Sequence, residues 1–435
     1  MKKKKIHPYV LIILTFLGVI LIGTGLIALP ISSTSGKSFG FVDSLFMVTS
    51  AVCVTGLTVM DMSVQMTPFG VVVMTLLMEI GGLSIITIAV FFFIVIGAKI
   101  SVGNRFLLRE SLNQNSVGGI VGLVRRIVLT AVTIQLIGVV INMFAMMPYT
   151  NYDFFKALGY SVFHSVAAFN NAGFDIFGPN SMIPFAGNVI LNASTIFLIV
   201  VGGIGFVVIN DIIKKRSFKK LRLHSKIVLI TTLVLILGGM VLLKLTMNEM
   251  TWLQALFTSV TSRTAGFTTV DLSTLTPGAY LVVVILMFIG TSPCSTGGGV
   301  KTTTIFVIVA TIFYFAKGKK TKAFGRRIPD GAIFKAFVLV TLAMIVVVVG
   351  TFAICIIQPQ LGVQEVIFEV VSAFSTTGLS MGITTSLNKV NRLIISLLMF
   401  LGRIGPLTVI GVVNKNWMTD SKEDVQYVEE KVIIG

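Results

Sequence analysis

The chain has 435 residues, of which 55% are hydrophobic and only 12% are charged, and its formal net charge is +17 at pH 7. A soluble domain carries about 25% charged residues, so this composition excludes an ordinary soluble protein and predicts a chain largely embedded in a membrane. Apolar stretches of about 20 residues, the length that crosses a bilayer core as a helix, occur at 9–29, 127–147, 188–209, 227–243, 333–357 and 393–413.

The first expected element, at 9–29, follows four lysines and therefore begins like a signal peptide. Its apolar stretch is too long for the core of a signal peptide, and it lacks a small-residue cleavage pattern. We therefore expect this segment to be the first transmembrane helix.

Basic residues are unevenly distributed. Of the 34 lysines and arginines, 26 lie at the N-terminus, in three interior segments and in the C-terminal tail, six lie in the regions expected on the other side, and Lys301 and Arg403 lie inside apolar segments. By the positive-inside rule, both termini and the basic segments of a multi-pass cell-membrane protein should be cytoplasmic, where they would meet membrane lipid with anionic headgroups. Nucleic acid is not an expected partner, because no aromatic residues are interleaved to stack on bases. The interior basic segments are 99–126, 214–226 and 317–335.

A fourfold pattern repeats between these segments. Each unit has a long apolar span, a short apolar segment, a glycine-centred turn and a second span. The short segments are too short to cross a bilayer, so each should enter from outside and turn back. They lie at 41–52, 154–168, 252–262 and 364–374. The turns that follow read VTGL, NAGF, TAGF and TTGL at 54–57, 171–174, 264–267 and 376–379. A second glycine follows 24 to 29 residues later, at Gly81, Gly202, Gly290 and Gly402.

The repeats predict an all-α membrane protein with eight transmembrane helices around one central pore. Each of the four repeats would contain a first span (M1), a pore helix and a second span (M2), and only the third M2 is expected to be broken. The expected repeats are 1–98, 127–215, 216–316 and 332–414. Cytoplasmic loops are expected at 99–126 and 317–331, and a cytoplasmic tail at 415–435.

Non-helical backbone at membrane depth is tolerated only where it is buried in protein or lines water. Four such turns around one axis can supply rings of carbonyl oxygens that replace the hydration shell of a cation. Glycine allows the backbone conformations that such turns need, and the C-terminal ends of the short helices favour a cation. K⁺ at these turns is the expected metal, and the candidate ligands are Val54, Thr55, Gly56, Asn171, Ala172, Gly173, Thr264, Ala265, Gly266, Thr376, Thr377 and Gly378.

Two further features predict that the passage of ions through the central pore is controlled. Arg403 lies in the middle of the last apolar span, and a charge there costs about 2.5 kcal/mol or more unless it faces protein or water. We expect it to face the pore below the turns, with Glu79 as an alternative or additional partner. The sequence IGTSPCSTGGGVKTTT at 289–304 cannot form a continuous helix, so it is expected to form either a loop beneath the turns or a fixed kink. The candidate gate residues are Arg403, Pro293, Gly297, Gly298, Gly299 and Lys301.

The four turns, the TAGF at 264–267, the GGGVK at 297–301 and the GRIGPLT at 402–408 resemble the Ktr/Trk/HKT superfamily of potassium and sodium transporters, and most closely the bacterial Ktr membrane subunit. The resemblance covers nearly the whole chain. It implies a K⁺ pore, often stimulated by Na⁺, in which the glycines of the four turns form the selectivity filter and Gly56 favours K⁺. Cys53 departs from the threonine-like residue that is more usual there.

The resemblance also implies partners and regulation. A homodimer would sit on a cytosolic ring of RCK-type nucleotide-binding regulatory subunits, which would carry ATP or ADP, and the segment 289–304 would be the intramembrane gate loop. No cofactor is expected in this chain, and no catalytic motif indicates an enzyme. The alternative is a secondary transporter for Na⁺ or another small solute, which the fourfold parallel repeat disfavours because most such carriers use two inverted halves.

Overall fold

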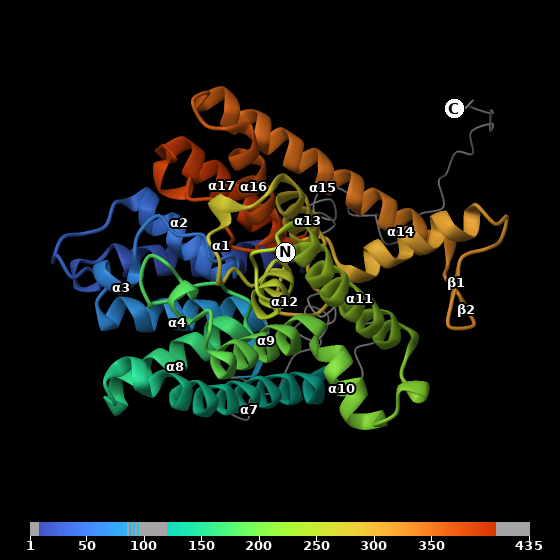
Figure 1. Cartoon of the computed structure of the whole chain (residues 1–435), viewed down its shortest axis with the longest axis horizontal. Coiled ribbons are helices and arrows are strands. Elements are labelled where there is room, and N and C mark those ends of the chain that lie inside the picture. The colour runs from blue at the N-terminus through green and yellow to red at the C-terminus, as the bar shows by residue number, and fades with distance from the viewer. Residues whose placement is uncertain (1–7, 85–86, 89, 92–93, 95–119, 406–435) are drawn as a thin grey trace, which may run out of the picture.

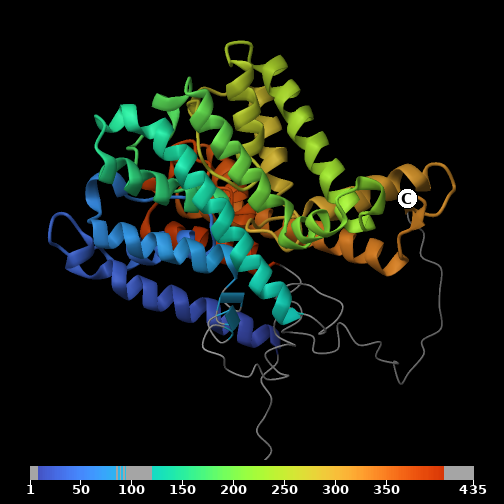
Figure 2. The ribbon, with the colours of Figure 1, turned by 90° about the horizontal axis from the view of Figure 1, so that it is seen from below.

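The computed structural model describes residues 8–84, 87–88, 90–91, 94 and 120–405. The expected tail at 415–435 and most of the expected loop at 99–126 lie outside the described residues. Almost all regular structure in the described part is helical (Figures 1 and 2). The exception is a hairpin of two short antiparallel strands, β1 (Lys322–Ala323) and β2 (Arg326–Arg327), which lies at one end of the molecule beside α14 (Thr302–Phe315).

Four long helices begin the four structural units. They are α1 (Pro8–Ala28), α7 (Ile120–Met146), α11 (Leu223–Thr246) and α15 (Asp330–Ile357). Among the described residues, four helices are long and apolar enough to cross a membrane, or five if the bent pair α9–α10 counts as one span. Only 17% to 33% of the apolar windows in the four are buried. Apolar surface of this extent must face lipid or another protein, so the chain is membrane-embedded.

The four predicted short segments are helical. They form α2 (Phe41–Val52), α8 (Phe154–Phe169), α12 (Trp252–Thr261) and α16 (Val363–Ser375). Two of these helices begin at side-chain caps. Asp153 caps α8 by accepting a bond from the Lys156 amide at 3.1 Å, and Thr251 forms a capping box with Gln254 at the start of α12.

The helices after the turns are α4 (Pro68–Leu83), α9 (Val189–Ile204), α13 (Pro277–Phe288) and α17 (Lys389–Ile404). Each begins at a side-chain cap, supplied by Thr67, Asn188, Thr276 and Asn388 respectively. The minor helices are α3 (Met62–Gln65), η1 (Pro30–Ser32), η2 (Met147–Thr150), η3 (Ile183–Phe185), η4 (Phe218–Lys220), η5 (Leu272–Thr274) and η6 (Thr384–Ser386).

The expectation that only the third M2 is broken was wrong. The helices α4, α9 and α17 all end at a residue with positive φ, at Ser84 (72°), Gly205 (93°) and Gly405 (85°). Each of these residues lies three positions after the second glycine of its repeat. After Gly205 the chain turns by 95° into α10 (Phe206–Lys215). A left-handed residue cannot continue an α-helix, so three repeats share one breaking position.

Two expected boundaries also need correction. The helix α7 begins at Ile120, so the last residues of the expected loop 99–126 are helical. The expected loop 317–331 contains the β1–β2 hairpin and the first two residues of α15. In both cases a long helix extends beyond its apolar core into the flanking polar residues.

The four units pack in a closed circle. In each unit the helix after the turn packs against the short helix of the next unit: α4 against α8, α9 against α12, α13 against α16, and α17 against α2. The last of these contacts closes the circle between the two ends of the described chain. An ion pair between Arg392 Nη1 on α17 and Asp43 Oδ1 on α2, 2.5 Å apart, joins the same two helices.

Candidate functional site

The four glycine turns share one unusual backbone conformation. Each glycine has positive φ, and so does the residue two positions before it. The pairs are Val54 (58°) and Gly56 (95°), Asn171 (57°) and Gly173 (68°), Thr264 (73°) and Gly266 (83°), and Thr376 (54°) and Gly378 (88°). The residue between each pair does not have positive φ. Positive φ at every second residue interrupts the regular helical and extended conformations, so each turn exposes backbone carbonyl groups that helices and sheets would engage in hydrogen bonds.

The amide groups of the turns point back to the short helices. The N–H of Thr55 donates to the Ser50 carbonyl at 2.8 Å, and that of Gly56 donates to Ser50 Oγ at 3.1 Å. Thr377 and Gly378 make the same two bonds to Ser372, at 2.8 and 3.1 Å. The corresponding amides of Ala172 and Ala265 donate to Ala167 O and Thr261 O, at 2.8 and 2.9 Å. These bonds engage the N–H groups on the side of each turn that faces its short helix. They leave the carbonyl oxygens of the turns on the opposite side.

The turns meet one another in cyclic order. A Cβ on Gly56 would lie 2.5 Å from Ala172 O, one on Gly173 would lie 2.7 Å from Ala265 O, and one on Gly266 would lie 2.5 Å from Thr377 O. A Cβ on Gly378 would collide with Thr55 O, which closes the ring. The structure thus brings all four predicted turns together around one axis. The carbonyl oxygens of Thr55, Ala172, Ala265 and Thr377 accept no hydrogen bond from the described residues.

The second glycine of three repeats packs directly against the C-terminal end of a short helix, just before the turn. A Cβ on Gly81 would collide with Val52 O, one on Gly202 with Phe169 O, and one on Gly402 with Phe374 O. Each of these carbonyls belongs to the residue two positions before the first left-handed residue of its turn. The equivalent glycine of the third repeat, Gly290, instead meets Gly298 O. The spacing seen in the sequence therefore reflects a close helix-to-turn contact that admits no side chain.

The segment 289–301 of the third repeat lies directly against the turns. Gly298 donates its N–H to Thr376 Oγ1 at 3.0 Å, and Thr296 Oγ1 lies 3.2 Å from the side-chain amide of Asn171. The backbone of the segment is also tied to the second repeat, because Ser292 and Thr296 donate to Gly203 O and Gly202 O at 3.1 and 3.3 Å. Pro293 O lies beside Gly205, where it leaves no room for a Cβ. A Cβ on Gly297 would collide with Thr264 Oγ1, so this non-helical segment packs against the second, third and fourth turns.

Arg403 joins this loop to the first repeat. Its guanidinium donates from Nη1 to Thr296 O and from Nη2 to Gly81 O, with a further bond to Gly82 O at 3.2 Å. Lys301, also a candidate gate residue, donates from Nζ to Gly297 O at 2.8 Å and to Gly298 O at 3.2 Å. Both cations are held by carbonyl oxygens.

Glu79, the alternative or additional partner considered for Arg403, does not bond to it among the described contacts. Glu79 Oε2 instead accepts hydrogen bonds from Gln135 Nε2 at 2.8 Å and from Asn170 Nδ2 at 2.6 Å. Glu79 therefore links α4 to α7 and to Asn170, the residue just before the second turn. Arg403 also contacts this part of α4, but its partners there are the backbone carbonyls of Gly81 and Gly82.

Sequence reasoning missed Glu369, which lies on α16 and is 1% exposed. It accepts hydrogen bonds from Ser380 Oγ at 2.8 Å and from Thr384 Oγ1, and both donors follow the fourth turn. The signal available in the sequence was an acid in the middle of an otherwise apolar short helix. Glu369 therefore anchors the chain that leaves the fourth turn.

Acidic residues also lie in the loops that follow the turns. Burial raises the pKa of Asp175 to about 6, and Asp61 adds to the rise, whereas bonds from Ser181 and from the Phe177 amide oppose it. The Phe177 N–H donates to Asp175 Oδ1 at 3.3 Å. Asp271 differs, because hydrogen bonds from Ser273 lower its pKa. No group of three or more metal-ligating side chains is found among the described residues.

A membrane-embedded circle of four units around carbonyl-rich turns defines a protein of the ion-transport class. The chain is matched from residue 5 to residue 421 by the model of the TrkH family, described as cation transport protein. It therefore belongs to that family, and the resemblance seen in the sequence is confirmed.

Several proteins resemble the chain along its length. It is 37% identical to the Ktr system potassium uptake protein B of Bacillus subtilis, over 98% of this chain and 96% of the relative. It is also 37% identical to the potassium/sodium uptake protein NtpJ of Enterococcus hirae, over 100% and 98% of the two chains. The crystal structure of the potassium transporter TrkH from Vibrio parahaemolyticus superposes with a TM-score of 0.76 at 18% identity, covering 96% of this chain and 87% of that one.

Proposed function

We propose that the chain takes up potassium ions across the cytoplasmic membrane as the ion-translocating subunit of a Ktr-type system. The observation that carries this proposal is the ring formed by the carbonyls of Thr55, Ala172, Ala265 and Thr377 between the four turn glycines. Oxygen rings of this kind can replace the water around a weakly hydrated monovalent cation. The names of the relatives from Bacillus subtilis and Enterococcus hirae support K⁺ as the ion.

The proposed selectivity filter consists of the first three residues of each turn, and K⁺ there is the proposed metal. These residues are 54–56, 171–173, 264–266 and 376–378. The gate is the segment 289–301 together with Arg403. Arg403 and Lys301 place two positive charges beside the loop below the turns, where they would oppose the passage of a cation. Movement of Gly297, Gly298 and Gly299 away from the turns would withdraw the obstruction and change the two carbonyl bonds, from Gly297 and Gly298, that hold Lys301.

In the proposed topology, eight transmembrane helices in four repeats surround the pore, and both termini are cytoplasmic. The basic segments that set this orientation would lie at an anionic lipid surface. We further propose a homodimer on a cytosolic RCK-type ring that binds ATP or ADP, as the likeness to Ktr proteins suggests. Stimulation by Na⁺ is part of the same proposal.

Ion uptake into proteoliposomes tests the function. Purified chain in vesicles with a K⁺ gradient should accumulate radioactive rubidium, and unlabelled K⁺ should compete with it more strongly than Na⁺ does. The alternative function, uptake of Na⁺, is suggested by the name of the Enterococcus hirae relative. Faster uptake of ²²Na⁺ than of rubidium under matched gradients would favour that alternative over K⁺ uptake.

A further inference from the structure

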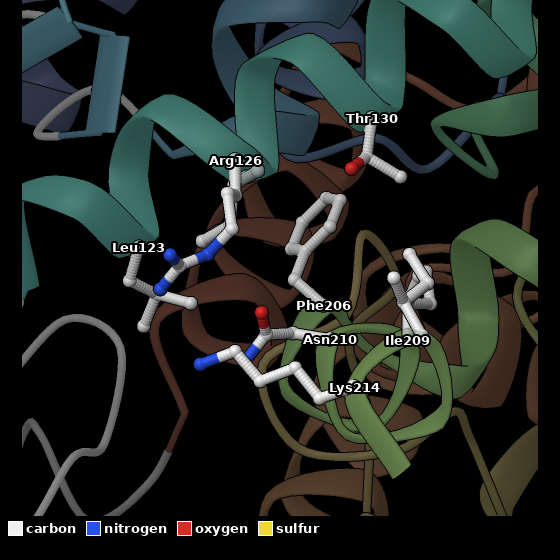
Figure 3. Close-up of a pocket in the computed structure, with 9 residues that line it drawn as sticks. Leu123, Arg126, Thr130, Phe206, Ile209, Asn210 and Lys214 are labelled. Carbon is white, nitrogen blue, oxygen red and sulfur yellow. The ribbon is translucent and has the colours of Figure 1, made fainter. Parts of the chain in front are cut away.

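A pocket of about 80 Å³ lies between the first three turns of α7 and the bent helix α10 (Figure 3). A single water needs roughly 10–15 Å³ measured in this way, so the pocket has room for a group larger than several waters. Its floor includes the buried side chains of Phe206 and Ile209. Its polar lining residues are Arg126, Thr130, Asn210 and Lys214.

The polar groups of the pocket converge. In Figure 3 the guanidinium of Arg126, the amide of Asn210 and the ammonium of Lys214 point to the same side, whereas Phe206 and Ile209 form the opposite wall. Phe206, Asn210 and Lys214 are spaced four residues apart and so lie along one face of α10.

The pocket is positively charged and carries no acid in its lining. Within the described part of the chain, neither Arg126 nor Lys214 forms an ion pair. The nearest acid in sequence, Asp211, is turned toward α11, where Oδ2 accepts bonds from the Arg222 amide at 2.9 Å and from Ser225 Oγ at 2.7 Å. Its Oδ1 lies 3.7 Å from Lys215 Nζ. The two cations of the pocket are therefore available to an anion.

The position of the pocket indicates the source of that anion. Under the proposed topology, α9 crosses the membrane and α10, bent from it by 95°, runs close to the membrane plane on the cytoplasmic side. One of the apolar lining residues, Ile213, is 57% exposed, so apolar surface continues from the pocket to the outside of the molecule. An apolar floor next to exposed apolar residues suits an acyl chain, which a soluble phosphate lacks. Basic pockets between transmembrane helices at the cytoplasmic surface bind anionic headgroups.

We propose that this pocket binds one anionic phospholipid, with the headgroup phosphate between Arg126 and Lys214 and the start of an acyl chain on Phe206 and Ile209. The proposal rests on the topology given above. The bound lipid would touch the helix that supports the loop, because the Phe206 N–H donates to Cys294 O at 2.9 Å.

Lipid retention by the purified full-length chain tests the proposal independently of transport. The chain is equilibrated in detergent micelles that contain phosphatidylglycerol or, separately, phosphatidylcholine, and bound lipid is counted by native mass spectrometry. The double variant R126Q/K214Q should bind phosphatidylglycerol about 30-fold more weakly, since each cation near an anionic surface contributes on the order of fivefold. Both side chains are exposed, so these changes should leave the fold intact.

The matched control is R125Q/K215Q, which removes two exposed cations from the same two helices without changing the pocket lining. It should retain phosphatidylglycerol like the unmodified chain. An equal loss in both double variants would overturn the proposal, because general surface charge would then explain the binding. Equal retention of phosphatidylcholine, or displacement of phosphatidylglycerol by millimolar inorganic phosphate, would also overturn it. Unchanged transport with loss of lipid would leave the proposed ion pathway intact.

Discussion

Arg403 donates a hydrogen bond to the backbone carbonyl of Gly81, although the two residues are separated by most of the chain. The same guanidinium bonds to Thr296 O in the loop of the third repeat. One side chain of the fourth repeat therefore holds the loop against the first repeat. The acceptors in these bonds are backbone carbonyl oxygens, which do not neutralise the charge of the guanidinium.

Replacing Arg403 by alanine should raise rubidium flux severalfold when no regulatory subunit is present. The change removes both the bonds to the loop and a positive charge near the path. R403K separates these effects, because lysine keeps the charge but lacks the planar fork of donors. If the bonds hold the loop, R403K should resemble R403A, and if charge alone matters, it should resemble the unmodified chain. K389A on the exposed start of α17 is the control, and unchanged flux in both Arg403 variants would rule out a gating role.

The variant G402A should destabilise the protein, whereas G25A should not. A Cβ on Gly402 would collide with Phe374 O, but a Cβ on Gly25 meets nothing within 4 Å. Overpacking of this kind costs about 1–3 kcal/mol, and a backbone carbonyl held at the end of α16 has little freedom to move. The apparent melting temperature in detergent, followed by size-exclusion fluorescence, measures the difference. Equal melting temperatures for the two variants would show that the helix-to-turn contact is not close in the native protein.

The variant G56S should weaken the preference for K⁺ over Na⁺ by about tenfold, which corresponds to about 1.4 kcal/mol. A Cβ on Gly56 would lie 2.5 Å from Ala172 O, so the oxygen ring must shift to admit it. Gly36 supplies the control, because it also has positive φ (68°) but has open space around it. Competition of K⁺ and Na⁺ with rubidium uptake gives the selectivity of each variant. If G36S lost as much selectivity as G56S, general backbone strain would be the cause.

Uptake should fall as external pH decreases from 7 to 5, in part through Asp175. Its raised pKa of about 6 means that the carboxylate is charged above this pH and takes up a proton below it. Loss of negative charge beside the second turn lowers the local cation concentration. D175N should therefore show reduced uptake at pH 7 and a flatter pH profile.

The matched control for this pH effect is D271N. Hydrogen bonds from Ser273 lower the pKa of Asp271, so that group stays charged throughout this range. D271N should keep the pH dependence of the unmodified chain. A D175N profile that still falls as steeply as that of the unmodified chain would exclude Asp175 as the titrating group.

Local sequence patterns predicted the elements near the site well. The short helices were predicted because apolar segments of limited length end at a glycine turn, and the structure has helices there. The breaks at Ser84 and Gly205 were missed, because serine and glycine both occur within apolar helices and neither demands a left-handed conformation by itself. Glu369 was missed for a related reason: its two donors, Ser380 and Thr384, lie beyond the turn and reach it only through folding.

Membrane embedding, the positions of the short helices and the glycines of the turns could all be read from the residues, because hydrophobicity and backbone freedom are local properties. Which groups meet became clear only in the folded chain. It paired Glu79 with Gln135 and Asn170 instead of Arg403, and it gave Arg403 carbonyl partners on two other repeats. Such long-range pairing depends on how four units close into a circle, and residue spacing along the chain does not specify that geometry.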